Sequence, residues 1–311
     1  MSSSSKPIIC CGFTPAIQRI ITLKKIKKGA VNRAESVTIG IGGKGANVAR
    51  MIHQLNGRAE LIEFSGGKNG RLLEQLLNAE GIGYRHIEVD GETRICQTLV
   101  ESGNPDTTEL VEEMPPITSN DWKKALLLFQ TLEHSGSWTA LSGKLPAGAP
   151  TDGYAEICRI AKEAGGKLIV DTQGEPLMHT LQHHPDLVKI NSRELADATG
   201  TDEISAGCRK LIERGAQAVF ITRGRRPSLY VDALRSLEID PPEIQAVNPT
   251  GSGDAVTAGL TLALNSGSSL KEALVQGTAC GAANALNLLS GHLIPKDIER
   301  LKTKVRVKRI T

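Results

Sequence analysis

The stretch Asn248-Pro249-Thr250-Gly251-Ser252-Gly253-Asp254-Ala255 runs directly into a helical pattern of small and apolar residues. Glycines at the start of a helix let backbone N–H groups point inward, and these groups together with the helix dipole favour an anion. We therefore expect the amides of Gly251, Ser252 and Gly253 to hold a phosphoryl group. Asp254 falls in the first helical turn, where the dipole favours an ionised carboxylate that could orient and deprotonate an alcohol. A capped helix whose acid only compensates the dipole would show the same pattern, so the motif alone leaves both interpretations open.

A second glycine turn, Gly42-Gly43-Lys44-Gly45-Ala46-Asn47-Val48-Ala49-Arg50, opens another predicted helix. Lys44 in such a turn could meet a substrate hydroxyl or phosphate. The glycines also fit G-x-G-x-x-G, with Glu60 about twenty residues on, which is the pattern of a dinucleotide site. Segment 32–39 before the turn is charged and does not resemble a buried strand, which disfavours that alternative. The sequence contains no G-x-x-x-x-G-K-[ST], so it lacks the P-loop pattern.

Short apolar runs alternate with helical patterns along the chain. The runs predicted to be buried strands are 8–13, 60–65, 138–142, 168–171, 187–190 and 219–222. The predicted helices are 45–54, 71–79, 120–133, 152–164 and 205–214, and 253–289 is helical with a break near Gly267. This alternation favours an α/β fold with a mostly parallel central sheet and helices on both faces. Ligands in such folds bind at the carboxyl ends of the parallel strands.

Two segments, 20–39 and 93–113, break this alternation. Both have the pattern of amphipathic strands, and neither is followed by a crossover helix of its own. We predict that they form a small antiparallel sheet that emerges from the main one. A lid at the ligand-binding edge would exclude water from a transfer reaction.

The composition limits the class of protein. The chain has 311 residues, 40% of them hydrophobic, and a formal net charge of +3. Basic runs at 24–28 and 302–309 lack interleaved aromatics, so we expect no nucleic-acid partner. Six cysteines without ligand spacing indicate free thiols and a cytoplasmic location, with Cys10, Cys11 and Cys280 expected to be buried. The apolar run after the serine-rich start is too short for a signal peptide, and no run is long enough to span a membrane.

The two glycine motifs, in this order and about two hundred residues apart, resemble the two signatures of the ribokinase/phosphofructokinase-B family of carbohydrate kinases. The resemblance covers nearly the whole chain. It implies a ribokinase-like three-layer sandwich, a single kinase domain over 1–311, and a β-sheet lid formed by about 15–40 and 92–114. Val31-Asn32-Arg33-Ala34-Glu35, Thr93-Arg94 and Ser142-Gly143 resemble the branch of tagatose-6-phosphate kinases, 1-phosphofructokinases and minor 6-phosphofructokinases. Asn248-Pro249-Thr250 is most similar to the tagatose-6-phosphate type.

The resemblance implies ATP-dependent phosphorylation of a sugar phosphate with Mg²⁺, which yields ADP and a bisphosphate. Asp254 would be the catalytic base, and the amides of residues 251–253 would form the anion hole. The residues implied to bind the sugar phosphate are Gln18, Gly43, Lys44, Asn47, Arg94 and Lys144. Those implied to bind ATP are Lys189, Asn191, Glu194, Thr222, Gly224 and Asn284. Within Asn191-Ser192-Arg193-Glu194, Glu194 would also hold Mg²⁺ through water, although this spacing equally predicts a helix capping box and the two roles are compatible.

Several positions depart from the family pattern. The first strand is followed by Thr14-Pro15-Ala16-Ile17-Gln18, where the branch usually ends in an acid, and Lys144 and Gln173 stand where Ser is usual. Arg225-Arg226-Pro227 lacks the usual second glycine. The parts for phosphoryl transfer are intact and the sugar-reading parts are altered. Because Lys144 adds a cation, we expect an anionic substrate, and a sugar other than a common ketohexose phosphate stays open.

Two alternatives stay open at this point. The first is a kinase of an unphosphorylated sugar or nucleoside, which would not need Lys44 and Arg94. The second is a non-catalytic sugar-phosphate sensor on the same fold, which the intact Asp254 disfavours. Lid strands in this family often pair between subunits, which makes a homodimer through the lid an expectation by analogy.

Overall fold

The structure is a computed structural model that describes residues 6–102 and 107–310. The serine-rich start and four residues of the second predicted lid segment therefore lie outside the described residues. None of the helices in the described ranges is long and apolar enough to cross a membrane. Cys10, Cys11 and Cys280 are free and buried, as predicted.

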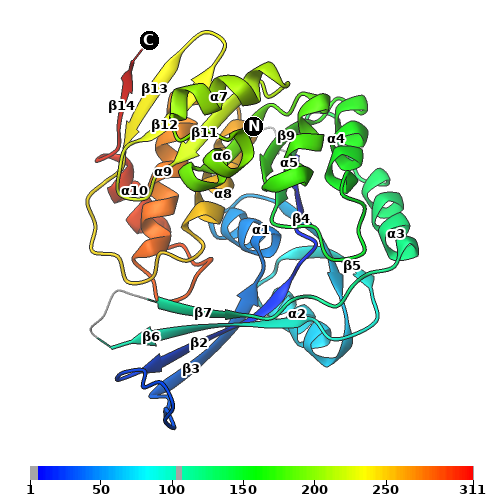
Figure 1. Ribbon diagram of the computed structural model, residues 1–311, viewed down its shortest axis with the longest axis vertical. Coiled ribbons are helices and arrows are strands. Elements are labelled where there is room, and N and C mark those ends of the chain that lie inside the picture. Colours follow the sequence, from blue (N-terminus) through cyan, green and yellow to red (C-terminus); the bar gives the residue numbers. More distant parts are fainter. Residues whose placement is uncertain (1–5, 103–106, 311) are drawn as a thin grey trace.

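Within the described residues, a ten-stranded sheet forms the centre of the molecule (Figure 1). In order across the sheet, its strands are β14 (Arg306–Arg309), β13 (Ser236–Asp240), β12 (Ser228–Asp232), β11 (Ala218–Thr222), β10 (Leu187–Asn191), β9 (Lys167–Asp171), β8 (Trp138–Ser142), β1 (Ile8–Cys11), β4 (Ala59–Ser65) and β5 (Gly83–Glu88). Neighbouring strands from β11 to β5 are parallel, whereas β12, β13 and β14 add an antiparallel edge. The six predicted strands all lie in the parallel part, which confirms the mostly parallel sheet.

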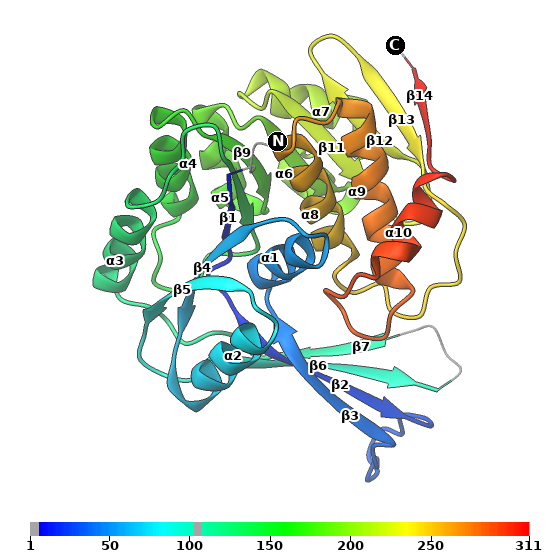
Figure 2. The ribbon, with the colours of Figure 1, turned by 180° about the vertical axis from the view of Figure 1, so that it is seen from behind.

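Helices cover both faces of this sheet, so the molecule has three layers (Figures 1 and 2). One face packs against α1 (Lys44–Gln54), α2 (Gly67–Ala79), α8 (Ser252–Asn265), α9 (Leu270–Ala285) and α10 (Pro295–Lys302). The other packs against α3 (Ser119–Gln130), α4 (Gly153–Glu163), α5 (Gly174–Thr180), a 3-10 turn (Leu181–His183), α6 (Ser192–Thr199) and α7 (Ile204–Glu213). Successive strand residues point to opposite layers: Ile8 and Cys10 join the first cluster, while Ile9 and Cys11 join the second.

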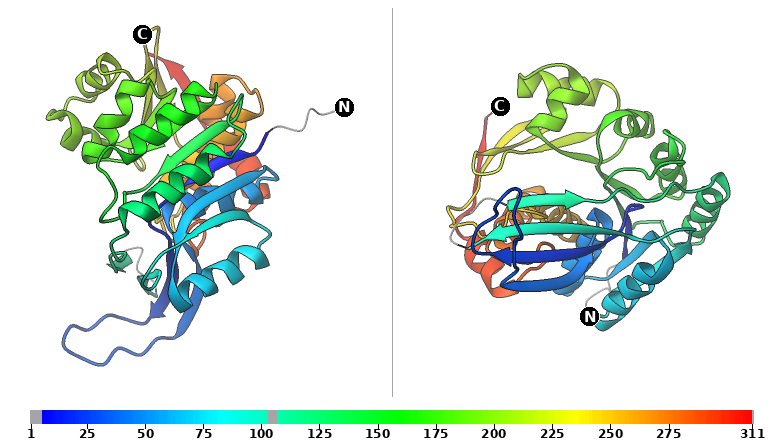
Figure 3. Two further views of the ribbon diagram at one scale, coloured as in Figure 1. Left: turned by 90° about the vertical axis from the view of Figure 1, so that its right-hand side faces the viewer. Right: turned by 60° about the horizontal axis from the view of Figure 1, so that its bottom comes forward.

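A second, four-stranded sheet projects from one end of the body (Figure 3). Its order is β3 (Ser36–Gly42), β2 (Ala16–Leu23), β6 (Arg94–Glu101) and β7 (Thr107–Val111). The two outer pairs are antiparallel, but the central pair, β2 and β6, is parallel, so the prediction of an antiparallel sheet is wrong there. The reason is topological: β2 and β6 each follow a strand of the parallel main sheet, β1 and β5. Both therefore leave the same edge of that sheet in the same direction.

Candidate active site

A cavity of about 710 Å³ opens between the carboxyl ends of the parallel strands and the inner face of the small sheet. Its lining includes residues from both glycine motifs, from both sheets and from the strand ends, as the fold predicts. The predicted site residues that line it are Gln18, Gly43, Lys44, Asn47, Arg94, Lys144, Lys189, Asn191, Glu194, Thr222, Gly251, Gly253 and Asp254. Ser252, Gly224 and Asn284 are the predicted residues that do not line the cavity.

The glycine turn at the start of α8 presents backbone to this cavity. Gly251 is the N-cap residue with φ +80°, a conformation that suits glycine, and no side chain caps the helix. The first-turn amides therefore lack the side-chain acceptor that a capped helix would supply. The amide of Ser252 is an exception, because it donates to the carbonyl of Pro249 at 3.1 Å. Of the three predicted donors of an anion site, the amide of Ser252 is therefore engaged within the turn, and the amides of Gly251 and Gly253 remain the candidates.

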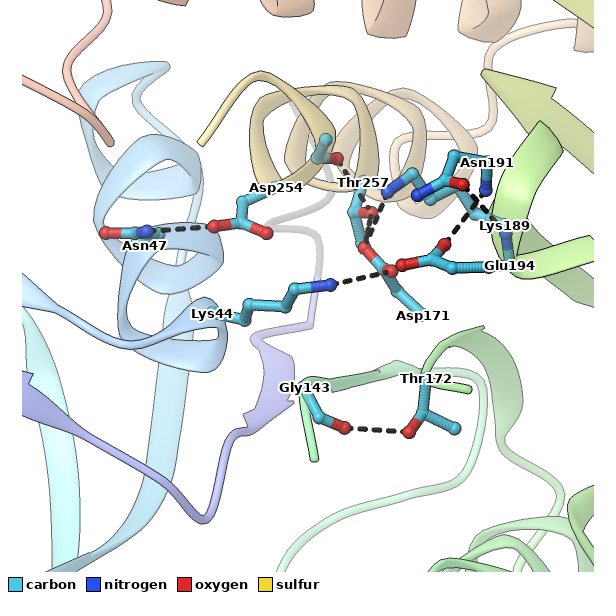
Figure 4. A network of polar contacts seen from close by, with 11 residues as sticks. Lys44, Asn47, Gly143, Asp171, Thr172, Lys189, Asn191, Glu194, Asp254 and Thr257 are labelled. Atoms are coloured by element: carbon cyan, nitrogen blue, oxygen red, sulfur yellow. Dashed lines mark hydrogen bonds and ion pairs between the residues drawn. The ribbon is translucent and has the colours of Figure 1, made fainter. Parts of the chain in front are cut away.

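Asp254 points into the cavity from the first turn of α8, and the residue is only 5% exposed. Its Oδ2 accepts a hydrogen bond from Nδ2 of Asn47 at 2.8 Å (Figure 4). Burial raises the pKa of this carboxyl to about 6, against the attraction of Lys44 and Lys189. Burial thus opposes the ionised form that the helix dipole favours. A carboxylate with such a pKa is ionised at neutral pH and is matched to proton transfer.

Asn47 reaches Asp254 because α1 starts very close to the end of β1. A Cβ on Gly45 would lie 2.5 Å from the Cα of Gly12, and a Cβ on Gly12 would lie equally close to the Cα of Gly45. Real Cβ atoms essentially never approach backbone so closely, so both positions require glycine. The first glycine motif therefore brings a helix against a strand and places the side chain of Asn47 beside Asp254.

Two ammonium groups face the same region. Nζ of Lys189 lies 2.9 Å from Oδ2 of Asp171, and Nζ of Lys44 lies 3.5 Å from its Oδ1 (Figure 4). Attraction by Asp171, then by Asp254 and Glu194, outweighs burial and holds the pKa of Lys44 above its usual value. The structure places Lys44 among these carboxylates, and its predicted contact with a phosphate on the sugar stays a prediction.

Asp171 itself is a site residue that the sequence interpretation missed. It is the last residue of β9, an otherwise apolar strand, and its side chain is buried. A charged residue that ends a buried parallel strand marks the ligand edge of the sheet, and this signal could have identified it.

The N-x-x-E motif forms the capping box that its spacing allows. Oδ1 of Asn191 accepts from the amides of Arg193 and Glu194 at 3.0 and 2.9 Å, and the Glu194 carboxylate accepts from the Asn191 amide at 3.0 Å. Both side chains also line the cavity. In the described part of the chain, no group of three or more His, Cys, Asp or Glu side chains is arranged to hold a metal by itself. This donor set fits Mg²⁺, which usually keeps waters and binds through one or two carboxylates plus substrate phosphates.

On the side of the small sheet, the cavity is lined by Gln18 and Arg94, two residues predicted to bind the sugar phosphate. Nε2 of Gln18 donates to Oγ1 of Thr98 on the neighbouring strand at 2.8 Å. Arg94 donates to the backbone carbonyls of Thr14, Pro15 and Glu112, so part of its guanidinium holds the root of the lid. Lys144 is exposed at the cavity wall.

The lid also touches the glycine turn. Oγ1 of Thr250 donates to the carboxylate of Glu109 on β7 at 3.1 Å. The small sheet is therefore in contact with the loop that precedes α8.

Two residues predicted to bind the nucleotide, Asn284 and Gly224, do not line the cavity. Asn284 is fully buried and joins the glycine turn to a neighbouring loop: its Nδ2 donates to the carbonyl of Thr250, and its Oδ1 accepts from the amide of Gly291. The amide group of Asn284 therefore supports the turn, and its predicted contact with ATP stays a prediction. Gly224 lies in the turn between β11 and β12 with φ +62° and outside the cavity, while Thr222 before it lines the cavity. Gln173 is exposed at the start of α5 and does not line the cavity either.

Comparisons with known proteins agree with this geometry. Residues 6–297 match the pfkB family of carbohydrate kinases. A Staphylococcus aureus protein described as a phosphofructokinase has 31% identity and a TM-score of 0.83 over 97% of this chain and 99% of its own. Phosphofructokinase-2 from Escherichia coli, solved with substrates and products, has 25% identity and a TM-score of 0.90 over 96% of this chain and 99% of its own. A Thermotoga maritima protein described as a 1-phosphofructokinase, at 21% identity and a TM-score of 0.88, covers 98% of this chain and 100% of its own and shares the fold. The chain belongs to the pfkB family of carbohydrate kinases.

Proposed function

We propose that this protein transfers the γ-phosphoryl group of ATP to a hydroxyl of a hexose phosphate. The acceptor would be of the tagatose-6-phosphate, fructose-1-phosphate or fructose-6-phosphate type, and the products would be ADP and a bisphosphate. The observation that carries this proposal is the placement of Asp254: a buried carboxylate beside an uncapped glycine turn, facing a cavity that Lys44 and Lys189 also line.

Asp254 accepts the proton of the attacking hydroxyl while the new O–P bond forms and the bond to the ADP oxygen breaks. The amides around Gly251 and Gly253 stabilise the charge on the phosphoryl oxygens, aided by the dipole of α8. Lys189 adds a cation at this turn, since a Cβ on Gly253 would lie 2.7 Å from its Nζ. The small sheet closes the cavity from the other side and excludes water, which would otherwise compete as acceptor.

Mg²⁺ would neutralise charge on the nucleotide phosphates during transfer. Glu194 and Asn191 are the residues placed to hold it through water, because both line the cavity next to the lysines. Thr222, at the carboxyl end of the neighbouring β11, extends the same edge toward the nucleotide.

The wall of the cavity supports an anionic acceptor. Lys144 and Arg94 add two cations to the pair near the base, and Gln18 contributes a neutral amide where a carboxylate would repel phosphate. Phosphofructokinase-2 from Escherichia coli, at 25% identity, has been solved with fructose-6-phosphate. We infer an acceptor that carries a phosphate of its own, and its exact sugar is the open part of this proposal.

The test is ADP release with ATP and Mg²⁺ over a panel of hexose phosphates, free sugars and nucleosides. We expect turnover with at least one hexose phosphate and a higher KM for it, roughly tenfold or more, in Lys144→Ala, because one charge-assisted contact is lost. Lys124→Ala, an exposed lysine on α3, is the matched control. Turnover only with unphosphorylated acceptors would replace the proposal by the first alternative, and ligand binding without any turnover would replace it by a sensor.

We also propose that residues 1–311 act as one kinase domain, with segments 15–40 and 92–114 as its lid, and that two copies associate through the lid. The outward face of the small sheet carries Val37, Ile39 and Leu110, which are 53%, 45% and 51% exposed. Strand register places all three on the face away from the cavity. Exposed apolar sheet faces favour association. Analytical ultracentrifugation should show a dimer that Ile39→Glu dissociates, and a monomeric wild type would refute this.

A further inference from the structure

Asp171 is a buried carboxylate on which three other elements of the site converge. It ends β9, is 1% exposed, and its Oδ2 accepts from Nζ of Lys189 on β10 at 2.9 Å and from Oγ1 of Thr257 on α8 at 3.0 Å. Its Oδ1 lies 3.5 Å from Nζ of Lys44 on α1. Figure 4 shows the two lysines approaching this carboxylate from opposite sides.

Charge compensation explains how these groups lie together in a buried region. Burial would raise the pKa of Asp171, but attraction by Lys189 and Lys44 outweighs it and holds the pKa below its usual value. Two ammonium groups that share one small region would otherwise repel each other and resist desolvation. The carboxylate lets both remain charged and turned inward.

Each lysine has a distinct neighbour on the reacting side. Nζ of Lys189 stands against Gly253, where an added Cβ would come within 2.7 Å of it. Lys44 interacts electrostatically with Asp254 and Glu194 as well as with Asp171. One cation therefore stands at the anion-binding turn and the other beside the base.

We propose that Asp171 is a positioning residue that fixes Lys189 at the anion turn and Lys44 beside the base before the substrates arrive. Cations that are already in position do not have to move during the transfer. The activation free energy therefore includes no cost for reorganising them. This inference rests on the proposed phosphoryl transfer. A purely structural role is the competing explanation, since the bond from Thr257 also joins β9 to α8.

The order of two substitutions separates these explanations. Asp171→Asn keeps the size and the acceptor for Thr257 but removes the charge, whereas Asp171→Glu keeps the charge and changes the size. An electrostatic positioning role predicts that Glu retains more activity than Asn, and a packing role predicts the reverse. Thr257→Val removes the hydroxyl contact alone and should leave kcat within a few-fold of wild type.

The quantitative test is a double-mutant cycle with Lys189→Met in the full-length protein. We expect Asp171→Asn to lower kcat by about a hundredfold, the effect of roughly 1 Å of misplacement, with much less change in the ATP dissociation constant measured by calorimetry. In the Lys189→Met background the same substitution should lower kcat less than in wild type, because one of the two groups that Asp171 holds is already gone and only its effect on Lys44 remains. If Asp171→Asn fails to fold because Lys189 is left as an unpaired buried charge, the double variant can still be measured, since it lacks that charge.

Independent multiplication of the two effects, or a kcat of Asp171→Asn within twofold of wild type, would overturn the proposal. Recovery of its activity by added Mg²⁺ would also overturn it, because Asp171 would then be a metal ligand. A crystal structure of Asp171→Asn gives a readout without turnover: Nζ of Lys189 should leave Gly253, and an unmoved lysine contradicts the inference. If wild type phosphorylates nothing in the panel, the proposed function fails, while this structural outcome still decides the positioning claim.

Discussion

The two glycine turns look alike in sequence but do different work in the fold. At the start of α1, glycine lets backbone meet backbone, because Gly45 and Gly12 leave no room for a Cβ. That turn acts on the site through its side chains, Lys44 and Asn47. At the start of α8, Gly253 leaves space that a lysine ammonium borders, and Gly251 exposes backbone to the cavity. The first turn allows close backbone packing and positions side chains at the cavity. The second turn lines the cavity with its own backbone.

This difference teaches how a glycine motif should be interpreted. The number and spacing of glycines indicate that chain and neighbour come close, but they do not say whether the neighbour is protein or ligand. What an added Cβ would meet decides between the two: backbone at 2.5 Å beside Gly45, and the end of a flexible side chain beside Gly253. Substitutions at the two turns should therefore fail in different ways.

The largest expected effect is at the acid that α8 carries. Asp254→Asn removes the proton acceptor while keeping its size, so kcat should fall by about 10²–10⁴-fold, and ATP binding measured by calorimetry should change little. Asp297→Asn, an acid in the first turn of α10, is the matched control and should keep wild-type turnover. Turnover within tenfold of wild type would show that the α8 turn is only a well-formed helix start.

The stability of the same variant should move in the opposite direction to its activity. The pKa of Asp254 is raised in the folded state. Its contribution to the free energy of unfolding is therefore fully present below the pKa of the unfolded state and is lost as the pH rises through about 6. At neutral pH the ionised form is a net cost that Asn removes. The melting temperature of Asp254→Asn at pH 7 should therefore equal or exceed that of wild type, and a marked decrease would attribute the lost activity to misfolding.

A pair of glycine substitutions tests the comparison directly. Gly253→Ala should preserve the fold but displace Lys189 and reduce kcat on the order of a hundredfold, because a shift of about 1 Å at the reacting centre has effects of this size. Gly45→Ala should instead lower the free energy of unfolding by about 1–3 kcal/mol or more, since two backbones must separate. Thermal melts and kcat of both variants provide the measurement.

Reversed outcomes would break the comparison. A destabilised Gly253→Ala with normal kcat per folded molecule would make the second turn a packing device as well. A stable Gly45→Ala with reduced activity would place the first turn among the ligand-binding groups.

Much of this architecture follows from local sequence. The six buried strands could be predicted because parallel strands covered on both faces read as continuous apolar runs. The antiparallel strands β12, β13 and β14 were missed. In β13 and β14, polar and apolar residues alternate and include charges such as Glu238 and Lys308. The parallel pairing of β2 with β6 was missed because pairing between distant segments depends on where each chain leaves the main sheet.

The site was predictable where a motif dictates backbone conformation, and less so where tertiary contacts set the role. Asp254, Gly251 and Gly253, which all line the cavity, were singled out from a single stretch, and their roles stay predictions. Ser252 belongs to the same stretch, but its amide donates to the carbonyl of Pro249 within the turn, which could not be predicted from the sequence. Asn47 was assigned to the substrate, whereas its amide contacts Asp254, a residue 207 positions away.

The smallest predicted effect concerns this link between the two turns. The hydrogen bond from Asn47 lowers the pKa of Asp254, so its loss in Asn47→Ala raises that pKa. The base must be ionised, so the rate falls below its pKa, and the acid limb of kcat/KM should move to higher pH by less than about one unit. Lys44 and Lys189 also lower the pKa and Asp171 raises it, so these three groups must stay unchanged in the comparison. Gln54→Ala, which removes an amide from the same helix at its contact with Leu293, is the control and should leave the limb near pH 6. A shift to lower pH, or none, would mean that the first turn serves the acceptor alone and that the two turns act independently.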